Sequence, residues 1–89
     1  MNEASRGVHL ATLAHEGRIW DAYLEFDDEP SLRDFRARVR FSSPEADRFY
    51  RTTVIIIEAS HEEAVHRARG LEIRQLEALL RSVLPDAEE

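Results

Sequence analysis

Three arginines stand at every second position in the middle of the chain: Arg36, Arg38 and Arg40. This spacing places them on one face of an extended strand, where they form a ladder of cationic groups. Guanidinium groups bind carboxylates or phosphates through paired N–H donors, and they also stack on aromatic rings. The ladder, together with Tyr23 from the preceding apolar segment, is therefore the predicted partner-binding surface.

The sequence leaves two uses of this ladder open. Asp21, Tyr23 and Glu25 alternate on the polar face of Ile19 to Phe26, and if that segment is the neighbouring strand, they can pair with the arginines across strands. Alternatively, the ladder and Tyr23 form a platform for a negatively charged partner, such as nucleic acid or an acidic segment of another protein. Internal pairing is the favoured interpretation.

Residue patterns typical of catalytic and metal sites are missing from the sequence. His61 and His66 suggest a zinc-protease helix, but they stand five residues apart, about 140° around a helix, whereas that chemistry needs a separation of four. There is no cysteine and the three glycines are isolated, which excludes thiol chemistry and a Gly-rich phosphate loop. We therefore expect a protein that is not an enzyme, with no catalytic residue, metal site or cofactor.

Charge and composition restrict the class of partner. The chain has 18 acidic and 12 basic residues, a formal net charge of −6, and every basic residue is arginine. Acidic chains repel the phosphate backbone, so nucleic acid is the less favoured partner. No stretch approaches the ~20 apolar residues that span a bilayer, and Met1 to Gly7 lacks the apolar run of a signal peptide. We expect a cytoplasmic protein without a membrane partner.

The arginine ladder has to be positioned by a sheet. Apolar residues alternate with the arginines in Arg33 to Phe41, which predicts a strand with one buried face. Ile19 to Phe26 alternates in the same way, and the polar stretch around Gly17 predicts a hairpin turn before it. The preceding Val8 to Leu13 fits either a strand or a helical turn. Arg51 to Ala59, with four consecutive β-branched residues at its centre, predicts an interior strand.

A helix is predicted to follow the last strand. Ser60 and Glu63 form a capping box, in which the Ser60 hydroxyl accepts from the backbone N–H three residues on and Glu63 reaches back. Apolar residues then continue at helical spacing to Leu84, before Pro85. The apolar stripe changes direction by roughly 100° at Gly70. The helix therefore either bends at Gly70 or stays straight and serves two surfaces.

These segments predict one α+β domain over residues 1–89, with disordered tails at 1–6 and 86–89. The predicted fold is an antiparallel sheet of three or four sequential strands, with one long C-terminal helix packed on one face. The predicted core residues come from both layers: Trp20, Leu24, Phe26, Phe35, Val39, Phe41, Ile55, Ile57, Val65, Ala68, Leu76, Leu79 and Val83.

The order of elements from Arg51 to Leu84 resembles that of double-stranded RNA-binding domains, which end in a three-stranded antiparallel sheet followed by a packed helix. The resemblance implies RNA binding. Where that family has a lysine-rich start to its last helix, this chain has His61-Glu62-Glu63, and the basic residues Arg67 and Arg69 come later.

The chain has more apolar surface than one helix can cover. Alternate residues of Val54 to Ile57 face opposite sides of the sheet, and Ile19 and Tyr23 lie on the outer side with one of those pairs. Such a patch is either covered by the stems of arginine and tyrosine side chains or marks a protein interface, most simply a two-fold homodimer. We predict a small protein-interaction module that binds a protein partner or itself. A nucleic-acid-binding domain that uses the arginine ladder is the alternative.

Overall fold

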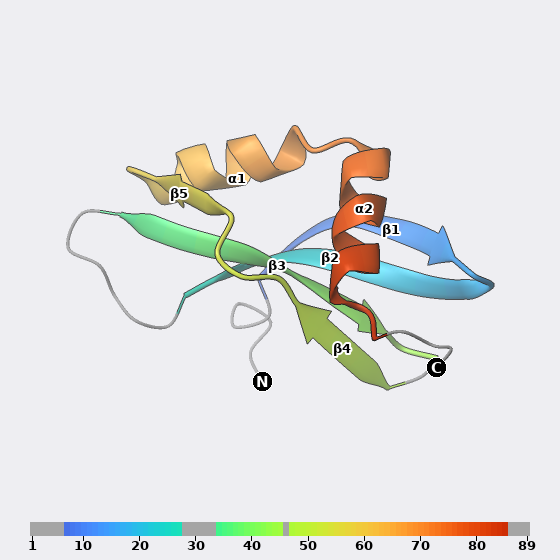
Figure 1. Cartoon of the computed structure of the whole chain (residues 1–89). Helices are drawn as coiled ribbons and strands as arrows, with labels where there is room; N and C mark the ends of the chain where they lie inside the picture. Colours follow the sequence, from blue (N-terminus) through green and yellow to red (C-terminus); the bar gives the residue numbers. More distant parts are fainter. Residues whose placement is uncertain (1–6, 28–33, 46, 86–89) are drawn as a thin grey trace.

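The computed structural model describes residues 7–27, 34–45 and 47–85, and the tails predicted at 1–6 and 86–89 lie outside these ranges. The elements follow in the order β1 (Val8–His15), β2 (Arg18–Phe26), β3 (Phe35–Ser43), β4 (Arg48–Arg51), β5 (Ile56–Glu58), α1 (His61–Arg69) and α2 (Ile73–Val83) (Figure 1). Strands β1 to β4 lie in sequential order in one antiparallel sheet, and β5 also pairs with β3. The predicted α+β class and the sequential antiparallel sheet are confirmed.

The first segment, for which the sequence allowed a strand or a helical turn, is strand β1 of the β1–β2 hairpin. Its turn consists of Glu16 and Gly17, whose φ angles of 52° and 78° are both positive. A two-residue hairpin turn of type I′ requires positive φ at both positions, and its backbone matches the twist of the strands. The pairing of Leu13 with Trp20 then places apolar side chains of both strands on the face that the helices cover.

Arg51 to Ala59 is not the interior strand that its composition predicts. Strands β4 and β5 both pair with β3 and lie at the edge of the sheet, separated by residues 52–55. The amide of Thr52 donates to Val39 O (3.0 Å) and the amide of Ile55 donates to Ala37 O (2.9 Å), so two residues bulge out between these bonds.

The pairing register of β5 determines which isoleucines are buried. Ile56 lies opposite Ala37 on the covered face and is buried, whereas Ile57 lies opposite Arg36 on the other face and is exposed. Ile55 is also exposed. The prediction that Ile55 and Ile57 belong to the core is therefore wrong. Phe35 is a further correction: it is exposed at the end of β3, where its ring contacts Phe26 and His61 edge to face.

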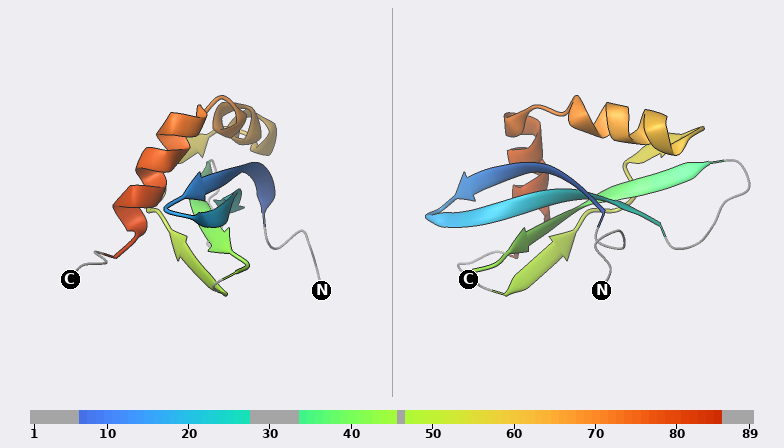
Figure 2. Two further views of the ribbon diagram at one scale, coloured as in Figure 1. Left: turned by 90° about the vertical axis from the view of Figure 1, so that its right-hand side faces the viewer. Right: turned by 180° about the vertical axis from the view of Figure 1, so that it is seen from behind.

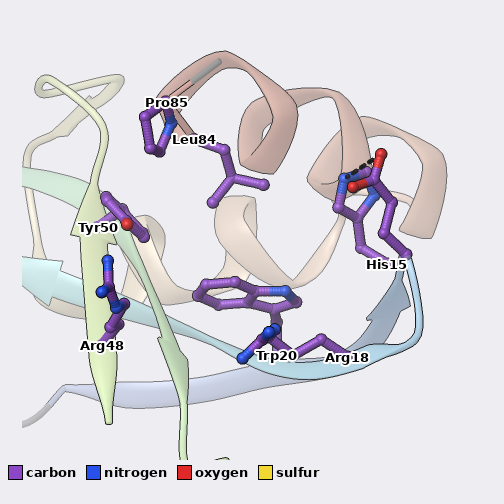
Figure 3. A pocket seen from close by; sticks show the side chains of 8 residues that line it. His15, Arg18, Trp20, Arg48, Tyr50, Leu84 and Pro85 are labelled. Atoms are coloured by element: carbon purple, nitrogen blue, oxygen red, sulfur yellow. Dashed lines mark ion pairs between the residues drawn. The ribbon is translucent and has the colours of Figure 1, made fainter. Parts of the chain in front are cut away.

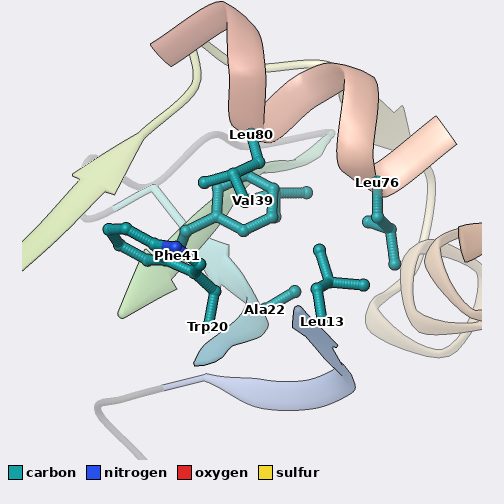
Figure 4. Packing of buried hydrophobic residues seen from close by; sticks show 7 residues of the cluster. All are labelled: Leu13, Trp20, Ala22, Val39, Phe41, Leu76 and Leu80. Atoms are coloured by element: carbon teal, nitrogen blue, oxygen red, sulfur yellow. The ribbon is translucent and has the colours of Figure 1, made fainter. Parts of the chain in front are cut away.

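The core lies between the sheet and the two helices, which cover the same face (Figure 2). One cluster forms beneath α2 and contains Leu13, Trp20, Ala22, Val39, Phe41, Leu76 and Leu80 (Figure 4). A second cluster forms beneath α1 and contains Leu24, Ala37, Ile56, Ala64 and Ala68. Of the predicted core residues, Trp20, Leu24, Val39, Phe41, Ala68 and Leu76 are buried, while Phe26, Val65, Leu79 and Val83 are half-buried.

The C-terminal helix begins where predicted but is divided in two. Ser60 is the N-cap of α1, and its hydroxyl accepts from the amide of Glu63 at 3.1 Å. The predicted single helix to Leu84 is wrong, because α1 ends at Arg69 and α2 begins at Ile73. Neither of these helices is long and apolar enough to span a membrane.

The break is stabilised at Glu72. Its backbone is extended, and its amide donates to the side-chain oxygen of Gln75 at 2.7 Å, which completes a capping box for α2. In a straight helix Glu72 would face the core, whereas here it is exposed. Gly70 itself has φ −83° and ψ −6°, a helical conformation that any residue adopts.

Replacement of Gly70 by alanine is therefore expected to preserve the break and to stabilise the fold by about 0.5–1 kcal/mol, through the lower entropy of the unfolded chain. An added Cβ would approach no closer than 3.4 Å to Arg67 O. Gln75→Ala is expected to cost about 1 kcal/mol, because it removes the side-chain oxygen that accepts from the amide of Glu72. Urea denaturation measures both changes. A clear loss of stability in Gly70→Ala would show that the glycine itself forms the bend.

Candidate functional site

One face of the sheet carries neither of the described helices. Both helices pack on the opposite face, and no element in the described ranges lies against this one (Figures 1 and 2). We call it the open face. Its side chains alternate with those of the core along each strand and include His9, Thr12, Ile19, Asp21, Tyr23, Glu25, Asp27, Arg36, Arg38, Arg40, Phe49, Arg51 and Ile57.

All four predicted partner-binding residues lie together on the open face. Tyr23 is directly opposite Arg40, and Glu25 is directly opposite Arg38. Arg36 follows at the next step along β3, where its carbonyl accepts from the amide of Asp27. The alternation in the two segments thus predicted both the strand neighbours and the shared face.

The arginine ladder is paired with carboxylates of the same face, and Arg40 and Arg38 each reach the carboxylate one step beyond the residue directly opposite. Arg40 Nε lies 3.4 Å from Glu25, and Arg38 Nη2 donates to Asp27 at 3.1 Å. Arg36 Nε lies 4.0 Å from Asp27. The ladder therefore has the internal pairing that strand alternation predicted, with Asp27 as a partner that sequence reasoning missed.

Glu25 forms ion pairs with arginines of two different strands. Arg51 of β4 donates to it through Nε at 2.7 Å and through Nη2 at 3.3 Å, while Arg40 approaches from β3. Arg40 and Arg51 are themselves directly opposite each other. The carboxylate of Glu25 thus lies between two guanidinium groups that would otherwise repel.

Aromatic rings extend this charged cluster across four strands. The guanidinium of Arg40 lies 4.8 Å from the ring centroid of Tyr23, and that of Arg51 lies 5.0 Å from the ring centroid of Phe49. His9 meets the Tyr23 ring edge to face at 5.3 Å. Cation–π contacts of this kind add attraction and fix the rotamers of the arginines. The middle of the open face is therefore an ordered surface.

Asp21, which sequence reasoning assigned to the ladder, has different partners in β1. Thr12 Oγ1 donates to Asp21 Oδ1 at 2.7 Å, and His9 Nε2 lies 3.0 Å from the same oxygen. The hydrogen bond from Thr12 holds the pKa of Asp21 below its ordinary value; burial opposes this shift, and His9 adds to it. Because this pKa is lower than in the unfolded chain, the carboxylate adds stability above the unfolded pKa, and that stability is lost as the pH falls through the folded value.

Replacement of Thr12 by valine is expected to raise the pKa of Asp21 and to weaken the acid-induced loss of stability that this residue causes, since the largest lowering contact is removed. Carboxyl-carbon NMR titration of Asp21 measures the pKa. Thr12→Ser retains the hydroxyl and should leave the pKa low. If valine left the pKa unchanged, His9 would be the residue that determines it.

The open face is nearly balanced in charge. Its described side chains include four arginines against the three carboxylates of Asp21, Glu25 and Asp27, whereas the whole chain carries a net charge of −6. Asp27 continues the alternation of Asp21 and Glu25, so that alternation could have identified it. Arg51 and Phe49 alternate too, but only the pairing of β4 with β3 brings them to this face.

The histidines are not grouped with described acidic residues into a metal site. Within the part of the chain that the structure describes, no group of three or more His, Cys, Asp or Glu side chains is placed to hold a metal ion. His61 instead stacks on Phe26, with ring centroids 4.6 Å apart. His9 belongs to the open face, as described above.

No family model, curated protein or solved structure matches the chain. The open face is therefore interpreted from its own geometry.

Proposed function

We propose that the protein is a small non-enzymatic interaction module whose open face binds a second copy of the chain. The observation that carries this proposal is the combination of balanced charge and exposed apolar side chains on one uncovered sheet face of an acidic chain.

Electrostatics favour this face for self-association. Two copies that each carry a net charge of −6 repel one another, so they approach most easily where the local charge is balanced. Homodimers with two-fold symmetry use the same patch twice, which requires a self-complementary patch. A two-fold axis along the strands, between β2 and β3, would place the arginine ladder of each copy opposite the carboxylates on β2 of the other. Charge complementarity of this kind determines register and specificity.

Exposed apolar side chains provide the contact area. Phe49 is 54% exposed, Ile57 is 47% exposed and Ile19 is 41% exposed, and the register places all three on the open face. Large apolar and aromatic residues in an interface are its usual anchors. Their positions around the charged centre would exclude water from the arginine–carboxylate pairs when two faces meet.

The pairing within the open face also supports a protein partner over nucleic acid. Phosphate binding draws its free energy from cations that can neutralise phosphates and release counterions. Here Arg36 and Arg38 lie beside Asp27, and Arg40 and Arg51 lie beside Glu25. Nucleic acid remains the alternative, and strong binding of duplex RNA or single-stranded DNA at low salt would favour it.

The test is sedimentation velocity at micromolar concentrations, with an expected mass of twice the 10.3 kDa chain. Phe49→Glu and Ile57→Glu are each expected to weaken the dimer by about tenfold or more, because each buries an unpaired negative charge in the interface of two acidic chains. Ile73→Glu is the matched control: Ile73 is 51% exposed but lies on α2, on the helix-covered side. Circular dichroism confirms that each variant is folded.

A strictly monomeric wild-type chain at high micromolar concentration would refute self-association. Equal weakening by Ile73→Glu would refute the open face as the interface.

A further inference from the structure

A pocket of about 520 Å³ lies at one end of the core, on the side of the sheet that faces the helices (Figure 3). It forms where α2 ends, between the tip of the β1–β2 hairpin and β4. Its lining residues are His15, Glu16, Arg18, Trp20, Arg48, Tyr50, Leu84 and Pro85. We call it the hairpin pocket. Its volume falls within the range of small-molecule sites, and it lies on the side of the sheet opposite the open face.

Four of the eight lining residues are aromatic or apolar, namely Trp20, Tyr50, Leu84 and Pro85. Trp20 and Tyr50 approach with ring centroids 6.0 Å apart at a tilt of 50°. Leu84 and Pro85 lie across the pocket from Trp20 (Figure 3). Trp20 is almost fully buried by the core cluster beneath α2, which holds its ring in one orientation. Trp20 therefore contributes only a small, rigid part of the pocket wall, and the half-buried Tyr50 presents the aromatic surface against which another ring can pack.

Two cations at the pocket have no anionic partner among the described residues. The side chains of Arg18 and Arg48 make no ion pair with any described residue, in contrast to the arginines of the open face. The single acidic lining residue is Glu16, which is well exposed and lies 3.9 Å from His15 Nε2. On a chain with a net charge of −6, this pocket is therefore locally cationic.

A buried polar group lies beside the same residues. Ser43 is fully buried, and its hydroxyl has no hydrogen-bond partner within the described part of the chain. It is paired with Arg48 across β3 and β4, and the neighbouring pair of Asp21 with Ser42 places it next to Trp20 in the register. Buried hydroxyls are normally hydrogen-bonded, so this end of the core is not optimised for stability alone.

We propose that the hairpin pocket binds an organic anion in which a carboxylate or phosphate is attached to a flat aromatic ring. The ring packs against Tyr50 beside the accessible part of Trp20, and the anionic group accepts hydrogen bonds from Arg18 and Arg48. Guanidinium groups suit both kinds of anion, because their planar donors match paired oxygens. This site goes beyond the proposed self-association and uses the other side of the sheet.

Trp20 is the only tryptophan of the chain, so its fluorescence reports directly on the pocket. Phenyl phosphate and benzoate are titrated into the full-length chain, and at least one is expected to change the emission saturably at millimolar concentration or below. The probe that binds more tightly identifies the anionic group. Benzamide, which has the ring without the charge, is expected to bind at least about tenfold more weakly.

Arg18→Gln and Arg48→Gln are each expected to weaken the binding of the better probe by about tenfold or more, since each removes charge-assisted hydrogen bonds. Arg69→Gln is the matched control, because Arg69 is an exposed arginine of α1 that likewise makes no ion pair with a described residue. The proposal is overturned if neither anion gives a saturable change, if benzamide binds equally well, or if Arg69→Gln weakens binding as much as the pocket variants. None of these outcomes depends on whether the chain dimerises.

Discussion

Replacement of Phe41 by alanine is expected to destabilise the fold by about 3–5 kcal/mol, through lost burial and the cavity left behind. Phe41 is fully buried at the centre of the cluster beneath α2, where Trp20, Val39 and Leu80 surround it (Figure 4). Small domains are stable by only about 0.05–0.15 kcal/mol per residue, so this loss would remove a large share of the total.

Phe35→Ala is the matched control, since it removes the same side chain from the same strand. Sequence patterning predicts both phenylalanines to be core residues, but Phe35 is 42% exposed. Its replacement is expected to cost about 1 kcal/mol or less. Guanidinium denaturation measures both variants, with a lower midpoint and an unchanged slope for Phe41→Ala. Equal losses for the two would contradict the distinction between core and exposed phenylalanine.

The two central strands were predictable because each alternates strongly between apolar and charged residues. Strand β2 has a single reasonable orientation, because one face carries Trp20 and Leu24 and the other carries Asp21 and Glu25. A shift of one residue would bury the charges, so burial itself fixes the phase. The same contrast in β3 placed the arginine ladder on the open face before any pairing was known.

The alternation is missing from residues 54–57, where every residue is β-branched and apolar. Nothing local distinguishes the buried Ile56 from the exposed Ile55 and Ile57. Which of these isoleucines is buried depends on the pairing with β3, almost 20 residues earlier in the chain, where Ala37 pairs with Ile56. Register between distant segments is a tertiary property, and the sequence pattern of one strand does not contain it.

The break between α1 and α2 was only partly predictable from the sequence. The apolar stripe changes direction at Gly70, which indicated a change of geometry there, but periodicity does not reveal its cause. The extended backbone of Glu72 and its capping box with Gln75 divide the two helices. Glutamate is an uncommon N-cap, so this capping box has no strong sequence signature.

The hairpin pocket could not be predicted at all, because its lining residues extend from His15 to Pro85 and no motif connects them. The open face was more accessible, since the four predicted residues come from two neighbouring strands. What the sequence could not supply there was the diagonal geometry: Arg51 reaches Glu25 from β4, two strands away. That diagonal makes Glu25 the residue on which the ladder depends most.

Replacement of Glu25 by alanine is expected to cost about 2–3 kcal/mol, the largest loss on the open face, because it removes the carboxylate between Arg40 and Arg51. The side chains of Glu25 and Arg40 are only 15% and 13% exposed, so water replaces the lost interaction poorly. Glu58→Ala is the control. Its partner Arg67 is 62% exposed, and surface pairs of this kind contribute about 0–1 kcal/mol.

A double-mutant cycle separates the ion pair from the loss of packing. If Glu25 mainly neutralises the two arginines, Arg51→Ala should recover about 1–2 kcal/mol of the loss in a Glu25→Ala background, because the cross-strand repulsion with Arg40 is then removed. A zero coupling would mean that the side chain of Glu25 matters only for its packing.

Glu25→Ala also tests the class of partner. If the carboxylates keep the ladder from binding phosphate, this variant should bind single-stranded DNA at low salt more tightly than the wild-type chain does. The protein-interaction proposal would lose its electrostatic support if the wild-type chain already bound the DNA equally well.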